Sequence, residues 1–204
     1  MDTLLLVFAK TPLSGTVKTR LAQSIGNEKA LWVYCQLLKR THAVVEELNH
    51  EQILFYSGEA PESFEPCFLS YNQKPQQGSD LGKRMAAAFQ WGFNEGYKKI
   101  VGIGTDLWDL DAKLLESAFS ELGTQEYVLG PASDGGYYLI GMKEPTPTLF
   151  QNKNWGTQTV LEETRNDLKG KSVGLLIEKN DIDTLADLKN TPELYTALKM
   201  KFND

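Results

Sequence analysis

Three cations and a glycine near the start of the chain are of the types that bind anions. An apolar run, residues 4–9, is followed by Lys10, Gly15, Lys18 and Arg20. In an extended loop Lys18 and Arg20 lie on the same side of the chain, and Gly15 permits a tight turn or a close ligand. Arg offers a planar fork to phosphate oxygens and Lys a point charge. The pattern favours a polyphosphate ligand; the alternative is a solvated loop whose cations pair with nearby acids.

A carboxylate follows another apolar run of the chain. Asp106 comes directly after residues 99–104 (KIVGIG), where it can hold Mg²⁺ or Mn²⁺ against phosphate oxygens, because such ions prefer oxygen ligands. Asp109 and Asp111 are better suited to capping the next helix. The alternative is that Asp106, like Asp109 and Asp111, is simply an acid in the turn before a helix.

The segment GPASDGGYYLIG combines an acid, two glycines and two tyrosines. Asp134 can orient an acceptor hydroxyl or help to bind a metal, and Gly135 and Gly136 indicate a backbone pressed against a ligand. An ordinary hairpin turn explains the same residues equally well. Tyr137 and Tyr138 point to opposite faces of a strand, so one of them is expected to face the site.

Two further segments carry polar residues near expected helix starts. In QQGSDLGKRM, Gln77 can read a base edge, and Gly82 in a first helical turn suggests the close approach of another group. The capping residue there is Ser79 or Asp80. In NDIDTLADL, Asp183 or Thr184 suits the cap of a helix, and a metal-ligand role for Asp183 is the less favoured interpretation.

The elements that must position these residues alternate between strands and helices, which predicts a single three-layer α/β/α domain over residues 1–204 with a central mixed, mostly parallel sheet. Asn27 is the expected N-cap of the first long helix, and residues 57–75 are expected to be loop-rich, with a possible short strand at 67–70. Ligands of such sheets bind at the carboxyl ends of the strands. The expected strands are 4–9, 52–56, 99–104, 125–129, 136–142 and 172–176, and the expected helices are about 28–48, 80–96, 112–122, 157–168, 182–189 and 192–201.

Composition restricts the classes of partner. The chain has 204 residues, of which 41% are hydrophobic and 24% charged, as in globular proteins. Its net charge of -6 provides no general attraction for nucleic acid or an anionic membrane, so neither is expected as a partner. No apolar run is long enough to span a bilayer, and the first residues do not read as a signal peptide. A cytoplasmic location is therefore expected.

Taken together, the motifs resemble the DUF2064 family over nearly the whole chain. This family, also described as radical-SAM/selenodomain-associated transferase 1, is a group of glycosyltransferase-A-like proteins. More distantly, the chain is similar to the nucleotidyltransferases of sugar, molybdopterin and phospholactate metabolism. The resemblance implies the nucleotide-diphospho-sugar transferase fold. It rests on FAKTPLSGTVKTRLA, QQGSDLGKRMAAAF, IGTDLWDLD, LGPASDGGYYLIG, NWGTQTVLEET and NDIDTLADL, in this order.

The resemblance also implies residue roles. Asp106 matches the acid that usually binds the divalent metal, and Trp155 falls in a segment that can close the pocket. Asp134 matches the acceptor side, with Gly135, Gly136 and Tyr137 beside it. The nucleotide phosphates fall to Lys10, Gly15, Lys18 and Arg20, and the base to Gln77 and Gly78.

One departure from the family pattern concerns the loop after Asp106. The family usually has Pro in G-x-D-x-P-x-L, whereas this chain has Trp108. Trp108 is expected either to reshape the metal loop or to fill the acceptor pocket.

These observations predict a transferase that depends on Mg²⁺ or Mn²⁺ and uses a nucleotide donor. The leading chemistry is glycosyl transfer from a nucleotide-sugar to a small-molecule acceptor. The first alternative is nucleotidyl transfer from an NTP to a phosphorylated acceptor with release of pyrophosphate. The second, supported by Trp108, is nucleotide binding without catalysis.

Overall fold

Seven strands form one mixed sheet in the order β3-β2-β1-β4-β6-β5-β7. The computed structural model describes residues 2–59 and 72–203. β6 is antiparallel to β4 and β5, and the other neighbouring strands are parallel. The strands are β1 (Thr3–Lys10), β2 (Glu51–Ser57), β3 (Asn72–Pro75), β4 (Lys99–Ile103), β5 (Tyr127–Pro131), β6 (Tyr137–Met142) and β7 (Val173–Leu175).

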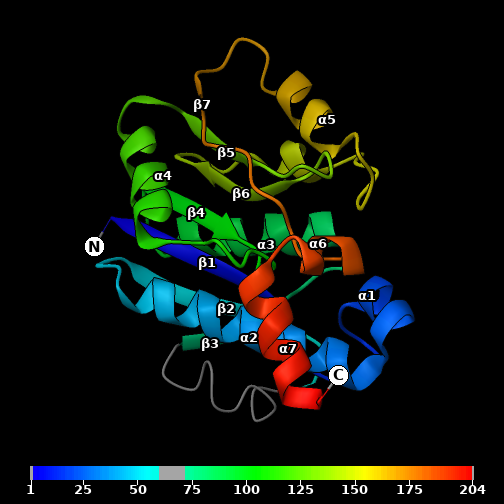
Figure 1. Cartoon of the computed structure of the whole chain (residues 1–204). Helices are drawn as coiled ribbons and strands as arrows, with labels where there is room; N and C mark the ends of the chain where they lie inside the picture. The colour runs from blue at the N-terminus through cyan, green and yellow to red at the C-terminus, as the bar shows by residue number, and fades with distance from the viewer. Residues whose placement is uncertain (1, 60–71, 204) are drawn as a thin grey trace.

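Helices cover both faces of the sheet, with α2 and α4 on one face and α3, η2 and α5 on the other (Figure 1). Alternate residues of β1 supply both cores: Leu5 packs against α2 and α4, and Leu4 against the opposite layer. Each fully buried leucine contributes roughly 1.5–3 kcal/mol. The helices are α1 (Thr19–Ile25), α2 (Asn27–Glu46), α3 (Leu81–Asn94), α4 (Ala112–Thr124), the 3₁₀ helix η2 (Pro147–Phe150), α5 (Val160–Asp167), α6 (Leu185–Lys189) and α7 (Pro192–Phe202).

A third cluster of apolar residues joins α1, α2, α6 and α7. It packs Leu21 of α1 against the C-terminal helices. The chain between β7 and α6 crosses the carboxyl ends of the strands, where Lys179 forms a bridge with Ala132 and the Ile182 N–H donates to the Asp106 carbonyl at 3.0 Å. This crossing places the acids of residues 181–183 beside the loop that follows β4.

The predicted fold class is confirmed, and three local predictions need correction. α1 was not expected; it buries one residue, Leu21, and so carries too little apolar pattern to reveal a helix. β3 was expected to be loop, because it is a short polar edge strand that ends in proline. The N-cap of α2 is Gly26, not Asn27. The expected strand at 67–70 lies outside the described residues.

Helix starts follow local hydrogen bonding, as the sequence indicates. Asp80 and Asp111 are N-caps whose carboxylates accept from the third backbone N–H of α3 and α4, at 2.9 and 2.8 Å. Thr184 forms a capping box with Asp187 at the start of α6. Of the helices described, none combines the length and the apolar character needed to cross a membrane.

Candidate functional site

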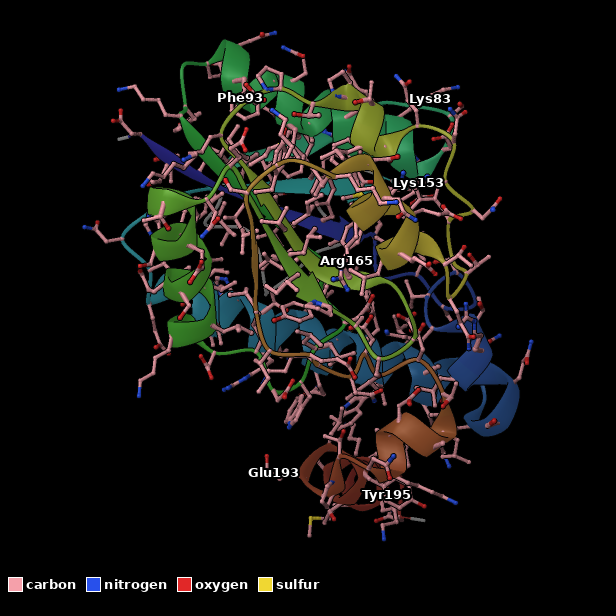
Figure 2. The ribbon with its side chains drawn as sticks, turned by 90° about the horizontal axis from the view of Figure 1, so that it is seen from above. Lys83, Phe93, Lys153, Arg165, Glu193 and Tyr195 are labelled. Carbon is pink, nitrogen blue, oxygen red and sulfur yellow. The ribbon has the colours of Figure 1, made fainter. Side chains whose placement is uncertain are left out.

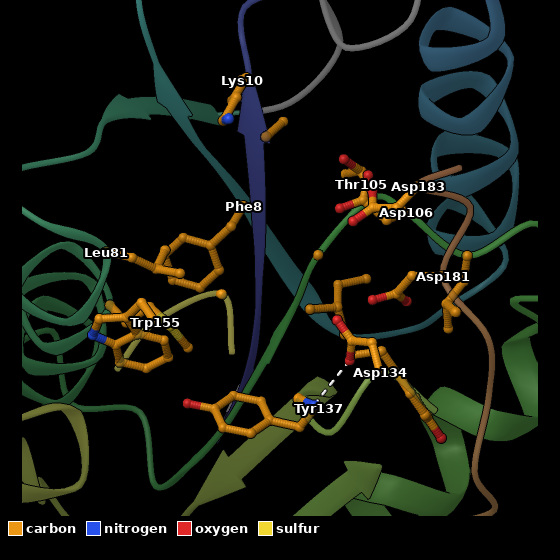
Figure 3. A pocket seen from close by; sticks show the side chains of 18 of the residues that line it. Phe8, Lys10, Leu81, Thr105, Asp106, Asp134, Tyr137, Trp155, Asp181 and Asp183 are labelled. Atoms are coloured by element: carbon orange, nitrogen blue, oxygen red, sulfur yellow. Dashed lines mark hydrogen bonds between the residues drawn. The ribbon is translucent and has the colours of Figure 1, made fainter. Parts of the chain in front are cut away.

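A cavity of about 610 Å³ opens at the carboxyl ends of β1 and β4 (Figure 3). One side of it is acidic, and the other carries the apolar side chains of Phe8, Leu81, Tyr137 and Trp155. Its volume is within the usual range for small-molecule sites. The charged residues that line it are Lys10, Lys18, Arg20, Arg84, Asp106, Asp134, Asp181 and Asp183.

Lys18 is the central cation of the acidic side. Its Nζ lies 2.6 Å from Asp106 Oδ1 and 2.9 Å from Asp183 Oδ1, and its side chain is only 4% exposed. Burial by itself lowers the pKa of Lys18, but the two carboxylates outweigh it and hold that pKa above its ordinary value. Arg20 lies at the edge, with Nη1 at 3.7 Å from Asp183 Oδ2.

Asp181 is an acid of the cavity whose charge is poorly compensated by its surroundings. Its Oδ1 is buried and has no hydrogen-bond partner among the described residues. Burial raises the pKa of Asp181 to about 7, and the neighbouring charges of Asp106 and Asp134 add to this rise. Asp134 is better satisfied, because its Oδ1 accepts from the Gly136 N–H at 2.8 Å.

The raised pKa of Asp181 predicts a pH-dependent stability without metal. The folded protein retains this proton up to about pH 7, whereas an unfolded Asp loses it near pH 4. The stabilising contribution is therefore complete below about pH 4 and is lost as the pH rises through about 7. Asp181→Asn should raise the melting temperature at pH 8 in EDTA by at least about 2–4 °C and change it little at pH 4. Equal effects at both pH values would contradict this assignment; thermal unfolding followed by circular dichroism measures them.

The opposite side of the cavity presents an apolar surface. Trp155 and Tyr137 meet edge to face, with ring centroids 6.4 Å apart. Leu81, the first residue of α3, is 44% exposed and borders the same hollow beside Phe8. Exposed apolar side chains in a concave site indicate a ligand with an apolar or ring-shaped face.

Most of the residues singled out in the sequence meet in this cavity, but Gly15, Gln77, Gly78 and Gly135 are not among its lining residues. The neighbouring Gln76 lines it instead and donates to the carbonyls of two strand ends. The predicted residues that do line it are Lys10, Lys18, Arg20, Asp106, Asp134, Gly136, Tyr137 and Trp155.

The close approaches at two of these glycines are made by the protein itself. A Cβ on Gly135, which has φ +87°, would lie 2.2 Å from the Gln158 carbonyl oxygen. A Cβ on Gly78, which has φ +142°, would lie 2.8 Å from the backbone nitrogen of Arg84. Gly135 and Gly78 are therefore required by packing and turn geometry.

Trp108 is not among the residues that line the cavity. It packs with the apolar cluster of α1, α2, α6 and α7, and its Nε1 donates to Glu193 Oε2 of α7 at 3.3 Å. Figure 2 shows Glu193 at the opposite end of the molecule from Lys83 of α3. The expectation that Trp108 fills the acceptor pocket is therefore wrong. The other expectation, that Trp108 reshapes the loop after Asp106, stays a prediction.

The acidic side chains suit a hard divalent cation in their chemistry. Asp106 and Asp181 offer carboxylate oxygens, and the unpartnered Asp181 Oδ1 is the kind of donor that such an ion satisfies. Over residues 2–59 and 72–203, no three acidic, His or Cys side chains are gathered as a ready-made metal cage. Magnesium commonly binds through one or two carboxylates, with waters and substrate phosphates completing its shell, so these residues fit that mode.

Asp181 was missed as a candidate in the sequence. Its segment, NDIDTLADL, is typical of a helix start, and the neighbouring residues give no sign of a buried acid. The path of the chain after β7 brings it next to Asp106 and Asp134. Phe8 and Leu81 give no signal either, because an apolar residue in an expected strand or helix cannot be told from a core residue.

Comparison with known structures agrees with this architecture. A candidate nucleotide-diphospho-sugar transferase of Desulfovibrio desulfuricans G20 is 30% identical, with a TM-score of 0.88 over 97% of this chain and 90% of that chain. Rv0371c of Mycobacterium tuberculosis H37Rv, solved with manganese, is 14% identical, with a TM-score of 0.57 over 95% of this chain and 99% of that one. CMP:2-keto-3-deoxy-manno-octonic acid synthetase, solved with CTP, is 9% identical, with a TM-score of 0.57 over 97% and 99%.

Comparison of sequences gives the family. No curated protein sequence matches the chain. The family model described as "Uncharacterized protein conserved in bacteria (DUF2064)" matches residues 40–157, more than half of the chain. Together with the Desulfovibrio structure, this match shows that the chain belongs to the DUF2064 family and has the nucleotide-diphospho-sugar transferase fold.

Proposed function

We propose that this protein is a metal-dependent transferase that uses a nucleotide donor, with glycosyl transfer from a nucleotide-sugar as the leading chemistry. The observation that carries the proposal is the meeting of Lys10, Lys18 and Arg20 with Asp106 in one cavity at the carboxyl ends of the strands. Carboxylates and cations side by side suit a polyphosphate bound together with a divalent ion. The fold itself does not select the reaction.

The donor phosphates bind on the charged side of the cavity. Lys10 and Arg20 are exposed at its rim and provide charge, and Arg20 adds a planar fork. Asp106 and Asp181 hold Mg²⁺ or Mn²⁺, which supplies charge neutralisation as the leaving group departs. Gln77 and Gly78, next to the lining residue Gln76, remain the proposed base-side residues.

The acceptor binds on the side of the β5–β6 hairpin. Asp134 orients an acceptor hydroxyl, and the hydrogen bond from the Gly136 N–H fixes its carboxylate for this task. Tyr137 and Trp155 form a wall against which a ring can pack. Gly135 permits this wall to form, because a residue with a Cβ would not fit against the backbone of Gln158, which lies in the same loop as Trp155.

Nucleotidyl transfer is the second candidate, and the number of cations favours it. Lys10, Lys18 and Arg20 all line the cavity, and three positive charges suit a triphosphate better than a diphosphate. In this reaction an acceptor phosphate oxygen attacks the α-phosphorus of an NTP, the bond to the β-phosphate oxygen breaks, and pyrophosphate leaves. The Mn²⁺ and CTP complexes of the fold relatives are compatible with either reaction.

A thermal-shift panel distinguishes the candidates. NTPs and nucleotide-sugars are each tested with and without Mg²⁺ or Mn²⁺, since a ligand selective for the folded state raises the melting temperature. A metal-dependent shift with a nucleotide-sugar supports glycosyl transfer, and one with an NTP alone supports nucleotidyl transfer. A shift that is independent of metal contradicts metal dependence and favours binding without catalysis.

Arg20→Ala tests the assignment of the phosphates. Its side chain is 61% exposed, so its loss should cost little stability. We expect donor affinity to fall about tenfold or more, because a charge-assisted bidentate contact is worth roughly 1.5–3 kcal/mol. Isothermal titration with the donor found in the panel measures it, and Arg165→Ala, outside the cavity lining, is the control. Equal affinities in the two variants would remove Arg20 from the phosphate site.

A further inference from the structure

Lys18 engages the same carboxylate that is proposed to hold the metal. Its ammonium contacts Asp106 at 2.6 Å and Asp183 at 2.9 Å, and its side chain is almost fully buried. We propose that Lys18 acts as a built-in counter-ion that competes with the divalent cation for Asp106 and is transferred to the donor phosphates when both ligands bind. This inference rests on the proposed function.

The backbone at Lys18 adopts a conformation that is uncommon for a residue with a Cβ. Lys18 is the N-cap of α1 with φ 47° and ψ 45°, in the left-handed region, and its side chain makes no capping hydrogen bond. A residue with a Cβ rarely adopts this conformation unless its surroundings impose it. The surrounding fold therefore imposes this conformation and fixes the point from which the Lys18 side chain reaches Asp106 and Asp183.

The charges around Lys18 make its release dependent on both ligands. Asp106, Asp134, Asp181 and Asp183 line one side of the cavity, and the buried Lys18 pairs with Asp106 and Asp183 and lies near Asp181. If phosphate binds without metal and draws Lys18 away, the carboxylates lose a positive partner. If the metal binds without phosphate, it must compete with the charge of Lys18. Metal and donor should therefore bind with positive coupling, each raising the affinity for the other.

Lys18→Met tests this role with Mn²⁺ as the only added ligand. The substitution keeps an apolar stem of similar length and removes the competing charge. Mn²⁺ should bind the variant at least about tenfold more tightly than the wild type in isothermal titration, since a unit charge at this range is a strong competitor. The metal-free variant should melt at a lower temperature, because Asp106 and Asp183 then repel each other, and Mn²⁺ should raise its melting temperature more than that of the wild type.

Two controls locate the effect. Arg20→Met removes an exposed charge that pairs with Asp183 at 3.7 Å, and it should change Mn²⁺ affinity much less. The double variant Lys18→Met/Asp106→Asn should lose the gain. Lys18→Gln, which keeps a hydrogen-bond donor, replaces Lys18→Met if circular dichroism shows that the latter is unfolded.

The possible outcomes separate this inference from the proposed function. Equal or weaker Mn²⁺ binding by a folded variant overturns the role of Lys18 and leaves metal dependence intact. No Mn²⁺ binding by either protein, with or without the donor from the panel, overturns metal dependence and the inference with it. Tighter Mn²⁺ binding by Lys18→Met together with weaker donor binding supports the competition, since simple loss of structure would weaken both.

Discussion

Asp106→Asn should abolish transfer while the protein still folds. Asp106 is the carboxylate shared by Lys18 and the proposed metal, and loss of such a ligand should reduce metal affinity or turnover by at least about 100-fold. The fold should survive, because the Asp106 side chain is 43% exposed and Lys18 retains its contact with Asp183. Release of product from the donor identified in the thermal-shift panel measures turnover, and the metal-dependent melting shift measures binding.

Asp109→Asn is the matched control for this prediction. Asp109 lies three positions further along the same loop, but its carboxylate pairs with Lys179 at 2.6 Å and does not line the cavity. It is 57% exposed, so we expect a stability change of about 1 kcal/mol or less and full metal dependence. If the two variants lose activity equally, the loop as a whole is required, and Asp106 has no special role.

Gly135→Ala should be among the most destabilising changes of a single methyl group. The added Cβ would lie 2.2 Å from the Gln158 carbonyl oxygen, and φ is +87°. The left-handed backbone costs a non-glycine residue about 1–2 kcal/mol, and overpacking against the backbone adds about 1–3 kcal/mol. We expect a total loss of about 2–5 kcal/mol in the free energy of unfolding, measured by urea denaturation.

Gly156→Ala separates the two contributions. Gly156 has a similar φ of +80°, but nothing lies within 4 Å of its added Cβ, so only the backbone cost of about 1–2 kcal/mol applies. Gly135→Ala should also weaken acceptor binding, since the Gly135 carbonyl accepts from the Leu161 N–H at 2.9 Å and joins the β5–β6 hairpin to the segment that follows Trp155. Equal destabilisation by the two substitutions would mean that the contact with Gln158 relaxes freely.

Local patterns in the sequence determined the fold class, most elements and several site residues. Continuous apolar runs indicate buried parallel strands, and the N-caps Asp80 and Asp111 follow from hydrogen bonds within a few residues. The same reasoning placed Lys10 and Asp106 at the ends of two strands, where open α/β sheets bind ligands. It overlooked α1 and β3, whose short, mostly polar sequences have no clear period.

Only the tertiary structure decided which of these residues act together. Lys18 and Asp183 are separated by 165 positions, and Asp181 joins them because the chain between β7 and α6 crosses the carboxyl ends of the strands. The direction of Trp108 and the contact of Gly135 with Gln158 depend on the same packing. Burial and pairing of charges are properties of distant segments brought together, and neither periodicity nor local hydrogen bonding encodes them.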